Sequence, residues 1–536
     1  MSVMATILAN GRFFTESGEV GFQDCMVVEG DTIVHVGSET DTVVREAKAA
    51  GATVHDVQQR YVLPGFIDGH MHLLQFGQSL QKLDLDGCRN LEDIRARIKN
   101  YARQHPDVPR ILCKGWMQTM TDSPVLASML DDIDPRPIFI DAKDLHSVWC
   151  NSTALRELAV EDKPDPAGGT INRDTNGKPS GLLNEAAVFS LVWPHLARVA
   201  SREDKMNALR AAIAAYTAHG YTGLVEMAMD DNAWDALLEL RQREQLPIRI
   251  AAHWLIVPSE DEAANLAQVD RAIALHKQYN LSTSPDLRIA GIKVICDGVI
   301  DACTAALLEP YSNNGSSCEP LWPAAKLAPV VQRAVQAGLQ CALHAIGDAT
   351  VRTALDVLEK HGSRDGRHRI EHLEMTTPED ARRLGQLGVT ASVQPVHSDP
   401  DILQAWPSLI GPERCRRAFA YKDFLDGGAP LALGSDSPTA PFNPLPNLYI
   451  ATTRRSARQP ESQETVNPNF ALPLAAAITA ATAGAAYACF ADSITGRLQP
   501  GLKADFVVVD MEWSPEKLLQ ARVRETWFAG KRVYCA

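Results

Sequence analysis

The feature that most constrains the fold is a repeated order of helix, glycine and short apolar strand along the middle of the chain. Ser201 is placed to cap a helix through residues 206–219, Gly220 ends it, and the apolar segment YTGLVEM follows as a strand. Gly338 and Gly388 end two further helices, each directly before another short apolar segment. Alternating helices and strands predict parallel βα units, and about eight such units close into a TIM-like (β/α)8 barrel of the α/β class. A doubly wound sheet is the alternative, but no GxGxxG phosphate loop supports it.

Both ends of the chain differ from the middle, because they contain short strand-like segments joined by turns and no long helix. CMVVEG and TIVHVG are such segments near the start, and ADFVVVD is another near the end. Each segment alone buries too little surface to be stable, so we expect the two ends to pair. The sequence therefore predicts a composite β-sandwich domain from residues 1–63 and 474–536, beside a barrel of residues 64–473.

The stretch after the first predicted barrel strand, at about residues 77–200, is too long for one βα step. It contains a helix that Asn90 is placed to cap and the strand-like segment PIFIDA. We interpret this stretch as an insertion in the barrel. We expect it also to carry the second barrel strand and to shape the entrance for a substrate.

Composition and charge limit the classes of function. The chain of 536 residues is 45% hydrophobic and 22% charged, which is ordinary for a globular protein and excludes a disordered, collagen-like or coiled-coil chain. It has 52 basic and 66 acidic residues, a formal net charge of −14 and no run of Lys or Arg. Nucleic acid and anionic membranes are therefore not expected as partners. We expect a small-molecule substrate and allow for a homodimer, the commonest oligomer.

Cysteine usage and the amino-terminal segment indicate a cellular location. The 11 cysteines include no CxxC pair, which argues against a disulfide scaffold and against a structural zinc finger. The first residues lack the basic region of a signal peptide, and no segment approaches the roughly 20 apolar residues of a membrane span. These patterns predict a cytoplasmic protein.

Polar residues follow the apolar strands directly, which is where a barrel places its active site. His70 and His72 come first, in FIDGHMHLL. Residues two apart in an extended segment project to the same face, so both imidazoles can reach one metal ion. Alone, an HxH pattern is common by chance, but its position after a clear apolar strand favours a metal site.

Four later strands end in the same way. They contribute Lys293 in LRIAGIKVICDG, His344 in CALHAIGD, His372 in RHRIEHLE and Asp436 in PLALGSDSP. Each has an ordinary explanation, since a buried histidine can bond to backbone, an aspartate can cap a helix and a lysine can extend to solvent. An ammonium group within an apolar strand is nevertheless costly unless it is paired or modified. Their occurrence at successive strand ends favours one shared site.

With these motifs, the sequence resembles the metal-dependent amidohydrolase superfamily over nearly the whole chain. PGFIDGHMHL, IKVICDG, LHAIGD, RIEHLE and LGSDSP are similar, in this order, to its motifs at strands one, four, five, six and eight. PGLKADFVVVD is similar to part of its composite sandwich. Within the superfamily, the chain looks most like the branch that contains N-substituted formamide deformylase, through DLHSVWCNSTAL, GLLNEAAV and DGVIDACTAALLEPY.

The resemblance implies a centre of two zinc ions, with His70, His72 and Asp436 on the first ion, His344 and His372 on the second, and a carboxylated Lys293 between them. Carboxylation turns a buried cation into an anionic ligand with two oxygens, whose charge two divalent ions offset. Imidazole and carboxylate ligands suit zinc, and iron, manganese or cobalt fits the same set.

The resemblance also implies a reaction, the hydrolysis of a C–N bond in a carboxamide or formamide. A metal-activated water attacks the carbonyl, and Asp436 takes the water's proton and passes it to the leaving nitrogen. Two alternatives stay open. One is a single-metal aminohydrolase of a nucleobase-like substrate, which lacks the bridging lysine, and the other is a catalytically silent regulatory or binding protein. A serine hydrolase is excluded because the sequence has no GxSxG motif.

Five further residues are candidate substrate contacts, namely Trp116, His146, Asn151, Glu185 and His397. Packing is the alternative role for Trp116, and structural hydrogen bonding is the alternative for the other four. The chain departs from the branch pattern after Asp297, where a stretch resembling GSLGSRTA is expected and GVIDACTA stands. The missing arginine leaves the substrate class open. Cys296 lies an odd number of residues from Lys293, so we expect it to pack on the opposite face of the strand.

Overall fold

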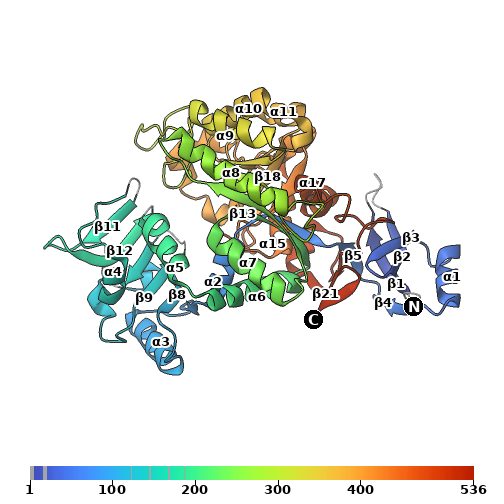
Figure 1. Cartoon of the computed structure of the whole chain (residues 1–536), viewed down its shortest axis with the longest axis horizontal. Coiled ribbons are helices and arrows are strands. Elements are labelled where there is room, and N and C mark those ends of the chain that lie inside the picture. Colours follow the sequence, from blue (N-terminus) through green and yellow to red (C-terminus); the bar gives the residue numbers. More distant parts are fainter. Residues whose placement is uncertain (1–4, 16–20, 122–123, 144–146, 167–168, 186) are drawn as a thin grey trace. The chain divides into compact units, whose positions relative to one another are not determined.

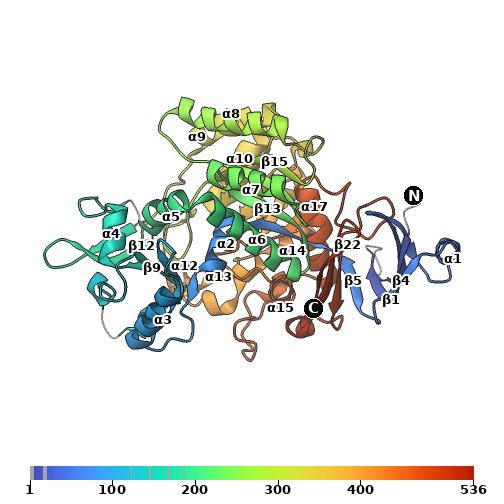
Figure 2. The same ribbon diagram turned by 60° about the horizontal axis from the view of Figure 1, so that its bottom comes forward.

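The computed structural model describes residues 5–15, 21–121, 124–143, 147–166, 169–185 and 187–536. These residues form two compact units. The first unit consists of Met1–His72, Ile213–Asp230 and Glu244–Ala536, and the second of Leu73–Ala212 and Asp231–Arg243. Figures 1 and 2 show both units as ribbons.

The first unit contains an eight-stranded parallel sheet in which the strands follow one another in chain order. The strands are β6 (Phe66–Met71), β13 (Tyr221–Met229), β14 (Arg249–Ile256), β15 (Leu287–Ile295), β16 (Gln340–Ala345), β17 (Arg369–His372), β18 (Thr390–Val393) and β19 (Leu431–Leu433). A parallel bridge between Met71 and Ser437 joins the end of the first strand to the segment after the last. The sheet is therefore a nearly closed barrel, as the sequence predicted.

Helices follow the barrel strands from the third onward. They are α8 (Glu262–Gln278), α9 (Ala324–Gln336), α10 (Asp348–His361), α11 (Pro378–Leu387), α12 (Trp406–Ile410), α13 (Pro412–Cys415), α14 (Tyr421–Asp426) and α15 (Pro444–Thr453). The predicted stop of α11 is confirmed, because Gly388 has a left-handed φ of 69°. Thr377 caps its start by accepting from the Asp380 N–H at 3.2 Å. Within the described residues, no helix combines the length and apolarity needed to span a membrane.

An alanine-rich segment covers the starts of the barrel strands. Ile67, Val225 and Ala251 from the first three strands share one buried cluster with Ala485 and Ala488. These alanines lie in α17 (Ala485–Ala488), which follows α16 (Leu474–Thr479). Apolar side chains thus fill the amino-terminal end of the barrel. The domain boundaries proposed from the sequence stay predictions.

A second sheet in the first unit contains strands from both ends of the chain. Its order is β22 (Lys531–Cys535), β21 (Arg522–Phe528), β20 (Phe506–Asp510), β5 (Tyr61–Pro64), β1 (Ala5–Phe14), β2 (Phe22–Glu29) and β3 (Thr32–Gly37), with β4 (Thr53–Asp56) also paired to β1. Val508 of β20 lies opposite Val62 of β5 in antiparallel register, and Figure 2 shows the blue and red strands together. Helix α1 (Thr42–Ala49) follows β3. A separate sandwich domain stays a prediction.

The second unit has a six-stranded sheet of its own. Its order is β11 (Gly169–Arg173), β12 (Pro179–Glu185), β10 (Ser147–Cys150), β9 (Ile138–Ala142), β8 (Ile111–Trp116) and β7 (Leu83–Asp84). Its helices include α2 (Leu73–Gln81), α3 (Leu91–Gln104), α4 (Ser152–Leu158), α5 (Trp193–Val199) and α7 (Asp231–Arg243), and α6 (Arg202–Ala218) passes from this unit into the first. Asn90 caps α3 as predicted, by accepting from the Asp93 N–H at 2.9 Å.

The expectation that the insertion carries the second barrel strand is wrong. The strands of the insertion pair with one another, and the first barrel strand pairs directly with β13, which follows the insertion. The physical reason is that PIFIDA finds its partners in β8 and β10, so its backbone groups are satisfied within the second unit.

Candidate metal centre

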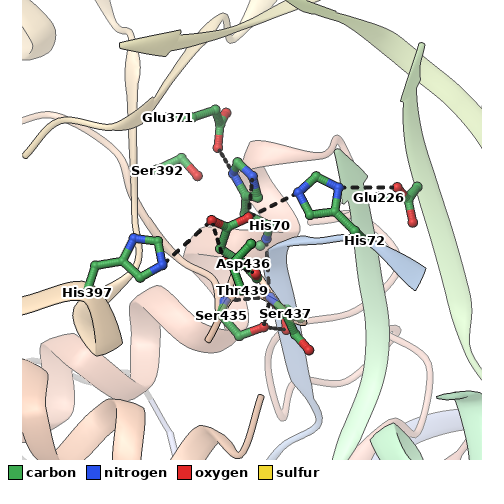
Figure 3. Close-up of polar contacts among 12 residues, drawn as sticks. His70, His72, Glu226, Glu371, Ser392, His397, Ser435, Asp436, Ser437 and Thr439 are labelled. Atoms are coloured by element: carbon green, nitrogen blue, oxygen red, sulfur yellow. Dashed lines mark hydrogen bonds and ion pairs between the residues drawn. The ribbon is translucent and has the colours of Figure 1, made fainter. Parts of the chain in front are cut away.

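The first and last barrel strands bring two imidazoles to one carboxylate. The backbone N–H of Asp436 donates to the His70 carbonyl at 2.7 Å, and the His72 N–H donates to the Ser437 carbonyl at 2.8 Å. Across this junction, Asp436 Oδ1 lies 3.3 Å from His70 Nε2 and 3.1 Å from His72 Nε2. Figure 3 shows both rings directed at the same carboxylate. The three residues predicted for the first ion therefore lie together.

Two of the candidate ligands have a left-handed backbone conformation, which is uncommon for non-glycine residues. Asp436 has a φ of 57° and His372 a φ of 76°. Non-glycine residues in this left-handed region cost about 1–3 kcal/mol and are concentrated at functional sites. The hydroxyl of Thr439 donates to Asp436 Oδ2 at 3.0 Å and helps to hold the carboxylate.

His344 and His372 come from the ends of β16 and β17. Their ring centroids are 4.4 Å apart, and the His372 ring lies 4.9 Å from that of His70. One nitrogen or oxygen from each of His70, His372 and Asp436 lies within 4.8 Å of the others, a spacing that one ion can bridge.

Lys293 lies on β15, with Ala342 of β16 beside it in register. Its side chain is 2% exposed, and its Nζ has no hydrogen-bond partner among the described residues. Burial lowers the pKa of Lys293 below its ordinary value, although the charges of Glu371 and Asp436 oppose this shift. The amine is therefore a buried, unpaired group beside the candidate ligands.

The protonation states of the other candidates suit a metal cation. Burial lowers the pKa of His344 to about 3 and that of His372 well below its usual range, so both rings are neutral near pH 7. Burial alone raises the pKa of Asp436, but hydrogen bonds from His70 and His72 outweigh this effect and hold it well below the usual range. Neutral imidazoles and an ionised carboxylate are ligands that zinc accepts. The donor set and the unpaired Lys293 amine fit the implied metals.

Sequence reasoning missed the acidic residues that orient these rings. His70 Nδ1 donates to Glu371 Oε2 at 2.7 Å, which leaves Nε2 for a metal, and Arg369 holds the same carboxylate through Nε at 2.5 Å. Glu226 Oε1 lies 3.9 Å from His72 Nδ1. Glu371 and His372 are adjacent in sequence, yet both lie against His70, and His372 has a left-handed φ of 76° at this point. The signal for Glu371 is its place directly before His372 in the RIEH motif.

His397, a predicted substrate contact, lies beside the candidate centre. It belongs to a short 3-10 turn, Pro395–Ser398, that follows the seventh strand. Its Nε2 is 3.6 Å from Asp436 Oδ2, and its Nδ1 is 3.4 Å from Glu374 Oε1. Figure 3 shows His397 on the opposite side of Asp436 from His72. This position is compatible with substrate contact, which stays a prediction.

The other predicted substrate contacts belong to the second unit. Trp116 is fully buried in an apolar cluster, with its ring centroid 5.5 Å from that of Trp149. Asn151 caps α4 by accepting from the Ala154 N–H at 2.9 Å. Glu185 ends β12 with a φ of 52°, and His146 lies outside the described residues. Their roles toward a substrate stay predictions.

The fold and this set of residues define a class of protein, the metal-dependent hydrolases built on a parallel barrel. The family model described as the amidohydrolase family matches residues 53–534. This range is most of the 536 residues, so the chain belongs to the amidohydrolase family. The family predicted from the strand-end motifs is confirmed.

Three comparisons place the chain among known proteins. It is 31% identical to Protein LONG AFTER FAR-RED 3 of Arabidopsis thaliana, over 98% of this chain and 91% of that protein. It is 23% identical to N-substituted formamide deformylase of Arthrobacter pascens, over 98% of each chain. The crystal structure of an uncharacterized metal-dependent hydrolase from Pyrococcus horikoshii matches with a TM-score of 0.81 and 25% identity, covering 96% of this chain and 99% of that one.

Proposed function

We propose that the protein is a metal-dependent hydrolase that cleaves a C–N bond in a small carboxamide or formamide. One observation carries the proposal, the buried Lys293 amine that has no hydrogen-bond partner among the described residues. An uncompensated ammonium in such a place costs several kcal/mol, about as much as a typical domain's whole stability. A modified lysine between two cations removes this cost. The likeness to N-substituted formamide deformylase over 98% of the chain supports the bond type.

Six residues would hold the metal, with His70, His72 and Asp436 on one ion, His344 and His372 on a second, and Lys293 between them. The uncharged Lys293 amine attacks carbon dioxide, a new N–C bond forms, and one proton leaves, so that a carbamate anion results. Burial favours this reaction because it lowers the lysine pKa and so increases the share of amine that is unprotonated. Zinc is the first expectation, and manganese, iron or cobalt suits the same ligands.

Bound divalent ions supply Lewis acidity, which lowers the pKa of water and polarises a substrate carbonyl. The chain's own residues then move the proton. Asp436 is ionised, so its carboxylate takes a proton from water as the water oxygen bonds to the carbonyl carbon. It passes that proton to the leaving nitrogen as the C–N bond breaks. Glu371 keeps the His70 ring in one tautomer by accepting from Nδ1. The products are an amine and a carboxylic acid.

A second candidate is a single-metal aminohydrolase that acts on a nucleobase-like substrate. The compact set of His70, His372 and Asp436 favours it, because three ligand atoms within 4.8 Å of one another suffice for one ion and leave out Lys293. The metal content separates the two candidates, since the first requires about two ions per chain and the second about one.

The test measures metal content and hydrolysis on the same protein sample. Purified protein is assayed with N-formyl amines, N-acyl amines, cyclic amides and nucleobases, before and after chelation and after addition of zinc, manganese or cobalt. We expect two ions per chain, loss of hydrolysis on chelation and partial recovery with metal. Full turnover by verified metal-free protein contradicts the proposal. Deamination of a nucleobase with one ion per chain favours the second candidate.

A further inference from the structure

A glutamine that follows the seventh barrel strand has an amide group with no partner. Gln394 is 1% exposed, and both its Oε1 and its Nε2 lack a hydrogen-bond partner among the described residues. Its backbone is held firmly, because its carbonyl accepts from the His397 N–H at 2.9 Å and from the Tyr421 hydroxyl at 3.4 Å. The backbone of Gln394 is therefore held in place, while its side-chain amide has no hydrogen-bond partner among the described residues.

Strand alternation directs the Gln394 side chain into the barrel. Ser392 faces inward, because its Oγ accepts from Arg369 Nη2 at 2.6 Å, and the same nitrogen donates to the Gly69 carbonyl of the first strand at 2.6 Å. Figure 3 shows Ser392 near Glu371, on the side of the candidate centre. Residues two apart in a strand share a face, and Gln394 keeps a near-extended backbone with φ −119° and ψ 89°. Gln394 therefore lies on the inner face of the barrel, two residues closer than Ser392 to the carboxyl-terminal end of the strands.

An unused amide at this position needs an explanation. A buried polar group without a partner costs about 1–3 kcal/mol, and Gln394 has two such groups. Such groups persist where another molecule supplies the missing partners, as in sites that recognise a substrate by hydrogen bonds. The Gln394 carbonyl accepts from the backbone N–H of His397, whose Nε2 lies 3.6 Å from Asp436 Oδ2, so the backbone of Gln394 adjoins a residue of the candidate centre.

The chemistry of a carboxamide defines what can pair with it. Its oxygen and one N–H lie side by side on one edge, which is how glutamine binds adenine through two hydrogen bonds. The complementary edge must present an N–H beside an acceptor. Primary amides, ureas and lactams have this syn arrangement. A trans N-substituted amide has its N–H and C=O on opposite sides, so only one of them can meet Gln394.

We propose that Gln394 determines substrate specificity by pairing with a syn amide edge, and that the substrate is a primary amide, a urea or a cyclic amide. This inference rests on the proposed C–N hydrolase function, because the recognised group belongs to the substrate of the same site. It narrows that function by excluding trans N-substituted amides as the preferred class.

The test replaces Gln394 by methionine, which has a similar length but lacks the amide. The matched control is Thr390→Val, which removes another buried polar atom without a partner among the described residues, at the start of the strand that precedes Gln394. Both variants and the wild type are prepared as full-length, metal-quantified protein. The probes are benzamide and 2-piperidone, which have a syn edge, and N-benzylacetamide, which is trans. Hydrolysis rates and probe-induced shifts in melting temperature are measured for each.

We expect Gln394→Met to melt at the same or a higher temperature than the wild type, because no hydrogen bond within the protein is lost. Its kcat/KM falls at least about tenfold on whichever of benzamide and 2-piperidone the wild type hydrolyses faster, and by less than about threefold on N-benzylacetamide. The shift in melting temperature caused by benzamide or 2-piperidone disappears in this variant and persists in Thr390→Val.

Three results overturn the inference. They are an equal loss on syn and trans probes, a lowered melting temperature with a uniform loss of activity, and a wild type that neither hydrolyses the syn probes nor shifts its melting temperature with them. The proposed function fails in a different way, when metal-loaded wild type binds 2-piperidone but hydrolyses no amide of either geometry.

Discussion

The barrel and the six-stranded sheet of the second unit both bury polar side chains, but the two regions differ in whether those side chains have hydrogen-bond partners. In the second unit, Asn151 is 1% exposed and both polar atoms of its side chain are paired, since Oδ1 accepts from the N–H groups of Ile138 and Ala154 and Nδ2 donates to the Arg136 carbonyl. In the barrel, Lys293 is 2% exposed and its Nζ has no partner among the described residues. A buried polar residue is therefore not by itself a sign of a site. A buried ionisable group whose hydrogen-bond partners are missing is the stronger sign.

The largest effect is expected from replacing Lys293, the barrel residue in this comparison. Lys293→Ala should remove most turnover and lower the metal content, because the proposed anionic ligand between the two ions is lost. Lys293→Arg should not restore either property, since guanidinium stays positive and cannot form a carbamate. Metal analysis and steady-state assays of both variants provide the measurement. The control is Lys326→Ala, which changes a lysine that is 37% exposed on α9.

Unimpaired turnover and metal content in Lys293→Arg would contradict the two-ion proposal and favour the single-metal aminohydrolase. A crystal structure of the active protein gives an independent check. It should show extra density on the Lys293 amine, between two metal ions about 3.5–4 Å apart.

The next effect concerns proton transfer. Asp436→Asn should lower kcat by roughly 10²–10⁴-fold while KM changes little, because proton transfer acts only in the transition state. Metal content is measured in parallel, since Asp436 is also a predicted ligand. The control is Asp426→Asn, an aspartate with a side chain 58% exposed at the end of α14. A kcat that excess metal restores fully would show that Asp436 is a ligand and not a proton carrier.

A smaller effect is expected from the residue that orients His70. Glu371→Gln should weaken metal binding or activity by about 10–100-fold, the usual cost of losing a carboxylate that supports a metal-binding histidine. The amide still fills the space but provides no charge for Arg369, which bonds to both Glu371 oxygens. Metal titration of the stripped protein measures the affinity, with the exposed Glu379→Gln as control. An unchanged metal affinity would show that Glu371 does not support the metal centre.

The sequence predicted the barrel because its evidence is local and repeated. Gly388 and Thr377 bound α11 through short-range contacts, and the strand-end positions of His70 and Asp436 follow from the parallel arrangement. Residues far apart in sequence were harder to predict. Glu226 lies near His72 because strands β13 and β6 pair side by side. The whole insertion separates these strands along the chain, so no local sequence pattern indicates the contact.

The same limit explains the second barrel strand. The segment PIFIDA has the apolar character of a barrel strand, and only its pairing with β8 and β10 shows that it belongs to another sheet. Gln394 was missed for a related reason. A glutamine has no special spacing in the sequence, and its unused amide is visible only when its neighbours are known.

The smallest effect on activity is expected from replacing Asn151 in the second unit. Its buried polar side chain is paired among the described residues, in contrast to that of Lys293 in the barrel. Asn151→Ala removes the cap of α4 and leaves the Ile138 N–H and the Arg136 carbonyl without their partner. Loss of a cap costs about 0.5–2 kcal/mol and a buried unpaired group about 1–3, so we expect a loss of unfolding free energy of roughly 2–4 kcal/mol. Turnover per folded molecule should stay within about twofold of the wild type, because a structural role does not require contact with the substrate. Denaturant unfolding and active-site-normalised kinetics measure the two quantities, with Asn176→Ala, in an exposed turn, as the control. A raised KM with unchanged stability would instead show that Asn151 binds the substrate, although both polar atoms of its side chain are paired within the fold.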